Sequence, residues 1–232
     1  MSGHTRPTPV QEKDGDEAVG RLARLDACAV SDALDKLGLP GATLGPTALA
    51  APRRITGRAV TVDLVEDRPG ITVSGRHLGT AAVDASGPGD VIVVAHHGRT
   101  RVAGWGGVLS TGAKRNGVEG VIVHGACRDV DEARALDLPL YATTAVPITA
   151  RGRVRERAWN VPVDIAGFPV SPGDLVIADA SGVVFIPAGQ ADEVLATAEA
   201  IAAKERAMIE RVRAGHAMAD VMSADYDTML DR

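Results

Sequence analysis

Apolar residues recur at helical spacing in some segments of the chain and at strand spacing in others, with Gly and Pro between them. From residue 18 to residue 37 the spacing is helical and Gly38 ends the segment, so we predict a helix there, broken near Val30. Further helices are predicted at 75–85, 105–116, 130–136 and 190–213. In the last of these, apolar residues dominate the first half and charges the second, so the first half is expected to dock on the core.

Short runs rich in β-branched residues predict strands between these helices. They lie at 58–66, 91–94, 121–123 and 140–144, and residues 149–188 add runs that are typical of antiparallel strands. The tripeptide Pro-Gly-Asp precedes a strand twice, at 88–90 and 172–174, which indicates one type of turn used twice. Strands that alternate with helices predict an α/β fold.

The composition favours one domain without a linker. No stretch of the 232 residues shifts in composition enough to mark a domain boundary. We therefore predict a single domain at 17–215, a polar N-terminal arm at 1–16 and an acidic C-terminal tail at 216–232. The N-terminus shows no signal-peptide pattern and no apolar run is long enough for a membrane span, so we expect a cytoplasmic protein with no membrane partner.

Charge and cysteine content argue against several classes of function. The formal net charge is -5 and aromatic residues make up 3% of the chain, so neither a basic stripe nor stacking side chains indicate a nucleic-acid partner. Two cysteines cannot form a disulfide framework, and their spacing matches no zinc motif. This cysteine usage is typical of a reducing, intracellular compartment.

The glycine-rich segment at 104–114 is the first candidate for chemistry. Its sequence, GWGGVLSTGAK, places glycines where the predicted helix begins. The free backbone N–H groups at such a helix start can bind a carboxylate or a phosphate. The alternative is a tight contact between helix and strand that requires small residues.

A second candidate, Arg128-Asp129, follows the predicted strand at 121–123. Side chains at the carboxyl end of a strand lie where α/β folds bind ligands. Arg128 offers two parallel hydrogen bonds to a carboxylate, and Asp129 offers an oxygen for Mg²⁺. The alternative is a surface ion pair in which Asp129 caps the following helix.

Other reactive side chains have structural interpretations. His96 and His97 are adjacent in a strand and point to opposite faces, which argues against a shared metal ion. His124 either lines the ligand cleft and titrates near neutral pH, or is hydrogen-bonded at a strand end. Cys127 is either a thiol of lowered pKa beside Arg128 or a small side chain, and we favour the second interpretation.

Lys114 and the pair Ser31-Asp32 also receive structural assignments. Lys114 follows the glycine segment on the predicted helix and is expected at the surface rather than as a nucleophile. Ser31-Asp32 is expected to cap a helix. Arg101 and Arg115 are candidates for additional positive charge near the cleft.

The segment GWGGVLSTGAKRNGVEGVIVHGACRDVDE at 104–132, followed by LPLYA at 138–142, resembles the RraA-like family. The similarity extends from VSDALD at 30–35 to Gly215, and its most specific part is the Arg128-Asp129 block. This family contains class II pyruvate aldolases that act on 4-hydroxy-4-methyl-2-oxoglutarate and 4-carboxy-4-hydroxy-2-oxoadipate. It also contains regulators of ribonuclease activity.

The resemblance implies a single-domain β/β/α swivelling-type fold that assembles into a homotrimer or hexamer, with the active site in a cleft between subunits. In the aldolases the matching Arg contacts the pyruvyl group, which implies that catalytic and binding role for Arg128. The matching Asp binds a divalent cation, so Asp129 is implied as a ligand of Mg²⁺ or Mn²⁺. Backbone amides of the loop that opens the helix bind the substrate carboxylate, and here they belong to Gly106, Gly107, Val108 and Leu109.

Two further positions bear on the activity that the resemblance implies. A family Glu from the adjacent subunit holds metal-bound water, and spacing matches it to Glu205; the alternative for Glu205 is a solvated helix face. The aldolases carry an Asp twenty-one positions before the Arg, where this chain has Gly107, so one outer partner of the metal is missing.

The resemblance implies a Mg²⁺-dependent lyase that cleaves a small 2-oxo acid such as 4-hydroxy-4-methyl-2-oxoglutarate to pyruvate, with oxaloacetate decarboxylation as a companion activity. Such a reaction passes through a pyruvate enolate, whose negative charge Arg128 would stabilise. The alternative is a non-catalytic regulator that binds and inhibits ribonuclease E. The retained Arg128 and Asp129 favour the lyase, and the missing carboxylate at Gly107 favours the regulator or a different substrate.

Overall fold

The structure is a computed structural model that describes residues 16–222. Of the predicted arm at 1–16, Asp16 alone is among these residues, and the last ten residues of the predicted tail, 223–232, lie outside them. Asp16 belongs to the domain, because its carboxylate accepts a hydrogen bond from Val19 N at the start of the first helix and forms an ion pair with Arg58.

The main sheet has nine strands of mixed direction in the described part of the chain. Their order is β1-β11-β10-β3-β4-β5-β6-β2, and β7 pairs with β3 beside this path. The four strands β3 to β6 run parallel to their neighbours in that series, and the other pairs are antiparallel. The strands are β1 (Ala42–Thr43), β2 (Thr47–Ala50), β3 (Ile55–Glu66), β4 (Asp90–Ala103), β5 (Gly120–Cys127), β6 (Leu140–Ala145), β7 (Val154–Trp159), β10 (Leu175–Asp179) and β11 (Gly182–Ile186), with β8 (Val163–Ile165) and β9 (Phe168–Val170) forming a second, two-stranded sheet.

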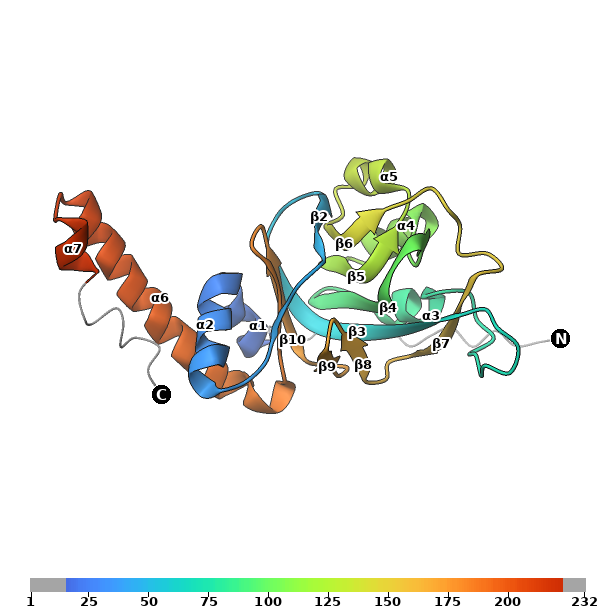
Figure 1. The fold of residues 1–232 in the computed structure, drawn as a ribbon, viewed down its shortest axis with the longest axis horizontal. Coiled ribbons are helices and arrows are strands. Elements are labelled where there is room, and N and C mark those ends of the chain that lie inside the picture. Colours follow the sequence, from blue (N-terminus) through green and yellow to red (C-terminus); the bar gives the residue numbers. More distant parts are fainter. Residues whose placement is uncertain (1–15, 223–232) are drawn as a thin grey trace.

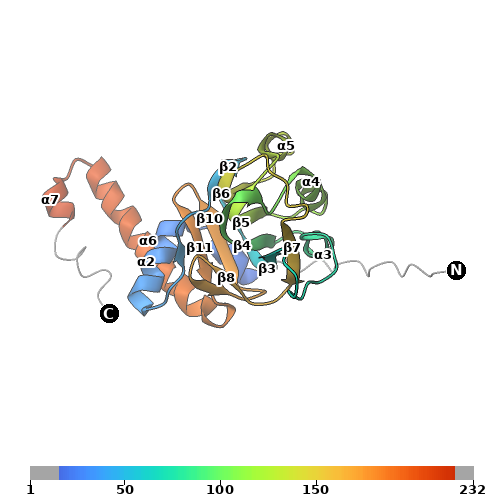
Figure 2. The same ribbon diagram turned by 45° about the vertical axis from the view of Figure 1, so that its right-hand side comes forward.

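Helices connect the parallel strands, because parallel neighbours cannot be joined by a tight turn. Figure 2 shows α3, α4 and α5 along one side of the main sheet, and each follows one of the strands β3, β4 and β5. The helices are α1 (Glu17–Leu22), α2 (Ala27–Leu37), α3 (Thr80–Ala85), α4 (Gly107–Arg115), α5 (Val130–Ala135), α6 (Ala191–Arg213) and α7 (Met218–Val221), with a short 3-10 helix, η1 (Ala188–Gln190).

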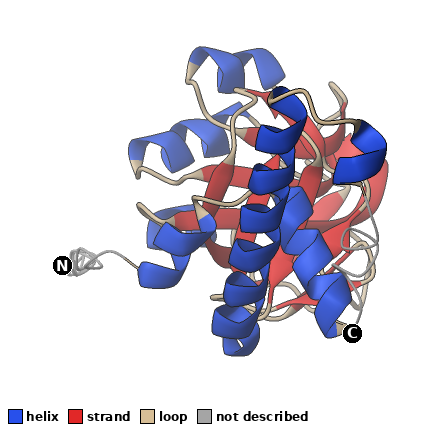
Figure 3. Cartoon of the chain, turned by 90° about the vertical axis from the view of Figure 1, so that its left-hand side faces the viewer, coloured by secondary structure: helices blue, strands red, loops and turns tan. Residues whose placement is uncertain are grey.

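Alternate side chains of the main sheet pack into different cores. Val94 and Val123 belong to the cluster beneath α3, α4 and α5, whereas Val93 and Ile122 pack with the strands β8 and β9. In the same way, Ile177 on β10 packs against α2 and α6. Figure 3, viewed from the side of α6, shows helices in front of the strands. The predicted α/β fold with β, β and α layers is confirmed.

The first predicted helix is broken, but the break lies earlier than expected. It separates α1 from α2 before Asp26, not near Val30, because the Asp26 carboxylate accepts the Ala29 N–H at 2.8 Å and caps α2. The assignment of Ser31-Asp32 as a helix cap is therefore wrong, since both residues lie inside α2. Gly38 ends α2 in the left-handed conformation, as predicted.

Two other predicted boundaries were wrong because polar residues and glycines obscured the pattern. The strand predicted at 91–94 continues to Ala103 through an irregularity at His97 and Gly98, which both have positive φ. The helix predicted at 75–85 begins at Thr80, because residues 75–79 form a loop that ends in left-handed Gly79. The antiparallel strands expected between 149 and 188 are confirmed as β7 to β11.

The two Pro-Gly-Asp sequences do form the same turn. Asp90 accepts a hydrogen bond from Gly87 N at 3.0 Å, and Asp174 accepts one from Ser171 N at 2.7 Å. The glycine of each tripeptide has φ near +80°, at +79° and +88°, which is the region that favours glycine.

Helix α6 docks by its first half, as its sequence predicts. Its buried side chains lie between Ala191 and Ala202, and Gly215 follows its end with a φ of +90°. Figure 1 shows that the second half of α6 extends away from the main sheet and leads into α7. Among the described helices, none combines the length and the apolar character that crossing a bilayer requires.

Candidate active site

A cleft of about 250 Å³ lies where α4 begins and β5 ends. Its walls come from the loop before α3, the loop that leads into α4, the two residues that follow β5 and a loop after β6. The lining residues are His77, Leu78, the segment 103–109, Arg128, Asp129 and the segment 149–151. The structure thus brings together all six residues that the sequence analysis assigns to the cleft of one subunit, namely Gly106, Gly107, Val108, Leu109, Arg128 and Asp129.

Backbone hydrogen bonds place Arg128 and Asp129 at the cleft. Strand β5 ends at Cys127, and the next N–H, that of Arg128, donates to the Trp105 carbonyl at 2.9 Å. Asp129 then adopts φ +57° and ψ +43°, a left-handed conformation that Asp tolerates better than most residues. This conformation turns the chain from the strand into α5.

The Asp129 carboxylate bridges the start of α4 and the neighbouring guanidinium. One oxygen, Oδ2, accepts the Gly107 N–H at 2.8 Å, and the other, Oδ1, accepts from Arg128 Nε at 3.1 Å. The alternative in which this side chain caps α5 is not observed, because Asp129 makes no side-chain capping bond to that helix. The other part of that alternative, an ion pair between Arg128 and Asp129, is observed, and both residues line the cleft.

The first turn of α4 presents backbone amides to the same cleft. Helix geometry leaves its leading N–H groups without acceptors inside the helix, and the helix dipole places partial positive charge there. Asp129 takes the amide of Gly107, and those of Val108 and Leu109 follow in the same turn. The Val108 side chain is 89% exposed, so this turn lies at the protein surface.

Close approach explains why Gly106 precedes this helix. A Cβ atom at position 106 would lie 2.9 Å from Asp129 Oδ2 and 3.1 Å from Arg128 Cγ, so both side chains would have to shift to make room for it. Tight packing therefore requires the small residue here. The helix start also faces the cleft, and anion binding by its amides stays a prediction.

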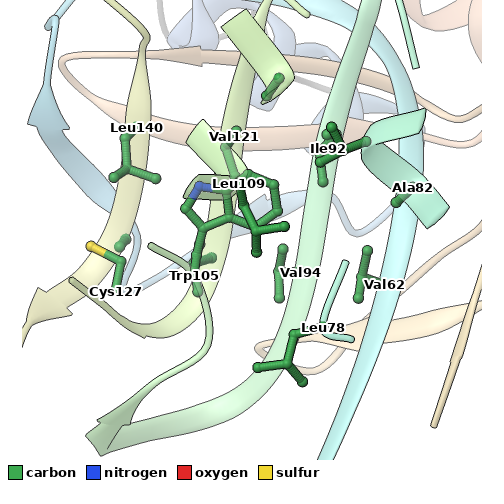
Figure 4. Packing of buried hydrophobic residues seen from close by; sticks show 14 of the residues in the cluster. Val62, Leu78, Ala82, Ile92, Val94, Trp105, Leu109, Val121, Cys127 and Leu140 are labelled. Atoms are coloured by element: carbon green, nitrogen blue, oxygen red, sulfur yellow. The ribbon is translucent and has the colours of Figure 1, made fainter. Parts of the chain in front are cut away.

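Trp105 lines the cleft and also packs in the hydrophobic core. Its ring is buried in the cluster under α3, α4 and α5, which also contains Leu109 and Leu78 (Figure 4). The indole Nε1 donates to Ser110 Oγ at 2.9 Å, so its polar atom is satisfied inside the core. A Cβ added to Gly79 would lie 3.2 Å from the indole ring, which shows how closely the loop before α3 packs on Trp105.

Glu205 is not part of the cleft of its own chain. It lies on α6 near α2, where burial and the negative charges of Asp26 and Asp32 raise its pKa above the ordinary value. Figure 1 shows α6 and α2 at the opposite end of the molecule from α4 and α5. Within one chain, the structure therefore does not bring Glu205 to Asp129, and its predicted role across a subunit interface stays a prediction.

The donor atoms of the cleft suit a cation that keeps most of its own water. Among the residues that the structure describes, no three His, Cys, Asp or Glu side chains cluster as a ready-made metal site. Mg²⁺ is commonly bound through one or two carboxylates, with water and substrate oxygens as its other ligands. Asp129 is 29% exposed and each of its oxygens accepts one hydrogen bond, which leaves a lone pair on each, so its carboxylate fits this type of site.

The three histidines that lie in strands β4 and β5 each form a hydrogen bond within the fold. His96 is fully buried and shares a hydrogen bond with the Val102 carbonyl, whereas His97 pairs with Asp63, so they do not share one ion. His124 accepts the Ala166 N–H through Nδ1 and does not line the cleft, and burial lowers its pKa.

Two further predictions concern nucleophiles. Burial raises the pKa of the Cys127 thiol to about 11, so the interpretation as a small buried side chain is confirmed and a lowered thiol pKa is excluded. Lys114 Nζ donates to the Asp137 carbonyl at 2.8 Å on the surface, as predicted.

The cleft also contains residues that the sequence analysis missed. Arg151, Thr149 and His77 line it, while Arg101 and Arg115, the expected sources of extra positive charge, are not among its lining residues. Arg151 and His77 lie in irregular segments of the structure. The sequence analysis placed His77 in the helix predicted at 75–85 and Arg151 in the strand-rich region at 149–188, and neither pattern indicated a position at the cleft. Their proximity to Arg128 results from the tertiary structure.

Comparison with known proteins shows the family of this chain. The family model described as "RraA-like: Aldolase/RraA" matches residues 27–185. A protein of Halalkalibacterium halodurans named "Putative 4-hydroxy-4-methyl-2-oxoglutarate aldolase" is 34% identical over 209 residues, which cover 88% of this chain and 94% of that protein.

Two further relatives differ in length and in description. Protein DlpA of Legionella pneumophila is 29% identical over 93% of this chain, which spans only 35% of the length of DlpA. The crystal structure of Streptomyces coelicolor RraAS2, described as an unusual member of the RNase ES inhibitor RraA protein family, superposes with a TM-score of 0.74 at 30% identity, and the match covers 87% of this chain and 99% of that one.

Proposed function

The chain belongs to the RraA-like family, and from this premise we propose that it is a divalent-metal-dependent lyase that cleaves a 4-hydroxy-2-oxo acid to pyruvate and a second carbonyl compound. A suitable substrate is 4-hydroxy-4-methyl-2-oxoglutarate, and decarboxylation of oxaloacetate is the companion activity. The observation that carries the proposal is the junction of Gly107 N, Asp129 and Arg128 at the start of α4. At this junction the Arg128 guanidinium, the Asp129 carboxylate and the backbone amides at the start of α4 face one cleft.

Asp129 is the residue that would hold the metal ion. Bound Mg²⁺ supplies a Lewis acid that polarises the 2-oxo group of the substrate. The contacts of Asp129 to Gly107 N and Arg128 Nε fix the orientation of its carboxylate before any ligand arrives. Such preorganisation lowers the cost of ordering a site when it is used.

Arg128 and the α4 amides would bind the reacting part of the substrate. The amides of Val108 and Leu109 suit the substrate carboxylate, because they combine free donors with the positive end of the helix dipole. The Arg128 guanidinium is 38% exposed and its remaining N–H groups are available to the 2-oxo oxygen, where negative charge develops when the C3–C4 bond breaks. One well-placed donor of this kind contributes about 3 kcal/mol to transition-state stabilisation.

The same charge requirement explains how one site serves two reactions. Retro-aldol cleavage and oxaloacetate decarboxylation both leave a pyruvate enolate, so both depend on Arg128. The protein carries a net charge of -5, and anionic substrates therefore need local positive charge. Arg128, Arg151 and the start of α4 supply it in the cleft.

The proposal includes a homotrimer or hexamer in which Glu205 of an adjacent subunit approaches the cleft. Two features support this part. The second half of α6, which carries Glu205, extends away from the main sheet (Figure 1), and the Val108 side chain at the cleft is 89% exposed. A neighbouring subunit would cover both surfaces.

The proposal is tested by measuring pyruvate release from 4-hydroxy-4-methyl-2-oxoglutarate and from oxaloacetate. We expect turnover with Mg²⁺ or Mn²⁺, loss of turnover with EDTA, and loss with Arg128→Gln. The matched control is Arg134→Gln, because Arg134 pairs with Asp131 on α5 in a comparable ion pair at the surface. Absence of turnover on both substrates with either metal would contradict the proposal.

A second candidate function is a non-catalytic regulator that binds and inhibits ribonuclease E. Two observations favour it, namely the structural similarity to Streptomyces coelicolor RraAS2 and the glycine at position 107 in place of the aldolase carboxylate. A pull-down with purified ribonuclease E, combined with an RNA-cleavage assay, tests it directly. Inhibition by a chain that shows no lyase turnover would favour the regulator.

A further inference from the structure

Cleavage of a 4-hydroxy-2-oxo acid requires a group that takes the proton of the C4 hydroxyl. The titratable side chains that line the cleft are Arg128, Arg151, Asp129 and His77. Arginine stays protonated in proteins, so neither guanidinium accepts a proton. The Asp129 carboxylate accepts from Gly107 N and Arg128 Nε, and its remaining lone pairs are assigned to the metal ion in the proposed function. Histidine is the side-chain type that exchanges a proton near neutral pH, which leaves His77.

The segment that carries His77 is held at both ends by Glu156. The Ser74 N–H donates to the Glu156 carbonyl at 3.0 Å, and the Gly79 N–H donates to its carboxylate oxygen Oε2 at 2.8 Å. Glu156 is fully buried on β7, so it offers a fixed anchor. The loop from Ser74 to Gly79 is therefore tied to the sheet on either side of His77.

Local contacts further define the position of His77. Its carbonyl accepts hydrogen bonds from Thr80 N at 3.2 Å and Thr80 Oγ1 at 2.8 Å, which fasten it to the start of α3. The next side chain, Leu78, is 7% exposed and packs in the cluster with Trp105 (Figure 4). The His77 side chain remains exposed at the cleft.

Trp105 connects the loop of His77 with Arg128. Its ring packs against the position of Gly79, and its carbonyl accepts the Arg128 N–H at 2.9 Å. His77 and Arg128 therefore lie on two walls of the cleft that both contact the buried Trp105. This arrangement sets His77 and Arg128 around a common space.

We propose that His77 is a catalytic residue that removes the C4 hydroxyl proton of the substrate, an inference that rests on the proposed lyase function. The neutral imidazole takes this proton, and the O–H electron pair forms the new C4 carbonyl. The C3–C4 bond breaks, and its electron pair forms the C2–C3 double bond of the enolate, with the negative charge on the C2 oxygen beside Arg128. The imidazolium then returns the proton to C3, which yields pyruvate and the neutral imidazole.

Comparing the two reactions distinguishes proton removal by His77 from a role of His77 in substrate binding. Oxaloacetate loses carbon dioxide without any hydroxyl proton to remove, and water can protonate its enolate, so its decarboxylation does not need His77. We expect His77→Gln to lower kcat for aldol cleavage by about 10²-fold or more, in the range for loss of a general base. Decarboxylation by the same variant should stay within about threefold of the unaltered protein, well below that range. His216→Gln is the matched control, because His216 is an exposed histidine outside the cleft.

A binding measurement gives a readout that does not depend on turnover. In an NMR spectrum of the protein with labelled histidines, the ring signal that disappears in His77→Gln belongs to His77. We expect pyruvate to shift this signal and to leave that of His216 in place.

Three results would overturn the assignment. Equal losses in both reactions would make His77 a binding or structural residue, and an unchanged aldol rate would exclude it from proton transfer. If saturating pyruvate does not shift the NMR signal of His77, this side chain lies away from the substrate. If the unaltered protein turns over neither substrate, the lyase function itself fails, and that outcome is distinct because it appears before any substitution.

Discussion

Replacing Asp129 by Asn removes the negative charge of the cleft while it keeps the shape of the side chain. The carboxylate accepts one hydrogen bond from Gly107 N at 2.8 Å and one from Arg128 Nε at 3.1 Å. The Asn amide retains one acceptor oxygen, which suffices for Gly107, and it presents an NH₂ group where Arg128 also donates. The substitution therefore removes the pairing with Arg128 and leaves the link to α4 intact.

The expected loss of stability is small. Arg128 and Asp129 are 38% and 29% exposed, so solvent screens their attraction. Ion pairs of this kind contribute about 0.2–1 kcal/mol, and for a chain of this size a loss of about 1 kcal/mol lowers Tm by about 2–4 °C. The expected loss of activity is much larger, about 10²-fold or more, as for removal of one group that stabilises charge in an active site.

The assay pairs thermal unfolding with pyruvate release from 4-hydroxy-4-methyl-2-oxoglutarate in the presence of Mg²⁺. Asp131→Asn is the matched control, since Asp131 is 91% exposed and pairs with Arg134 at 2.8 Å on the adjacent α5. It should change neither quantity. A Tm loss of Asp129→Asn well beyond about 4 °C would show that Asp129 is mainly a structural link, and full activity would refute its role as a metal ligand.

Two further predictions follow from packing and burial. Gly106→Ala should lower kcat/KM at least about tenfold, with little change in Tm, because its Cβ would meet Asp129 Oδ2 at 2.9 Å and displace the pair with Arg128; activity equal to that of the unaltered protein would contradict this. Burial lowers the pKa of His96 from 6.5 to about 4. The unfolded chain then binds this proton more readily, so stability should fall as the pH drops from about 6.5 towards about 4. Urea unfolding at several pH values measures this slope, and His96→Gln, which keeps a donor for the Val102 carbonyl, should flatten it in that range.

The sequence pattern predicted the parts of the fold that depend on local rules. Helix α4, helix α6 and the paired Pro-Gly-Asp turns follow from apolar spacing and from glycine at positive φ, and all three are observed. The break before α2 was misplaced because apolar spacing continues across it. Asp26 sets that boundary through a single hydrogen bond to Ala29 N, which periodicity does not reveal.

For the candidate site too, some features could be predicted from the sequence and others could not. Arg128, Asp129 and the opening of α4 are close in sequence and lie at the end of one strand and the start of one helix, so their chemistry could be predicted from adjacent residues. The role of the Asp129 carboxylate could not, because its hydrogen bond to Gly107 N joins residues on either side of α4 and β5. In sequence, an Asp that caps the following helix, α5, looks the same as an Asp that accepts a hydrogen bond from the preceding helix, α4.

The sequence by itself determined the type of fold, the family resemblance and the Arg-Asp pair, since each depends on residues that are neighbours along the chain. Tertiary structure alone decided that His77 and Arg151 line the same cleft as Arg128, and that Glu205 lies with Asp26 and Asp32 away from it. The physical reason is that these positions depend on long-range packing around Trp105 and on the anchor at Glu156, which connect segments far apart in the chain.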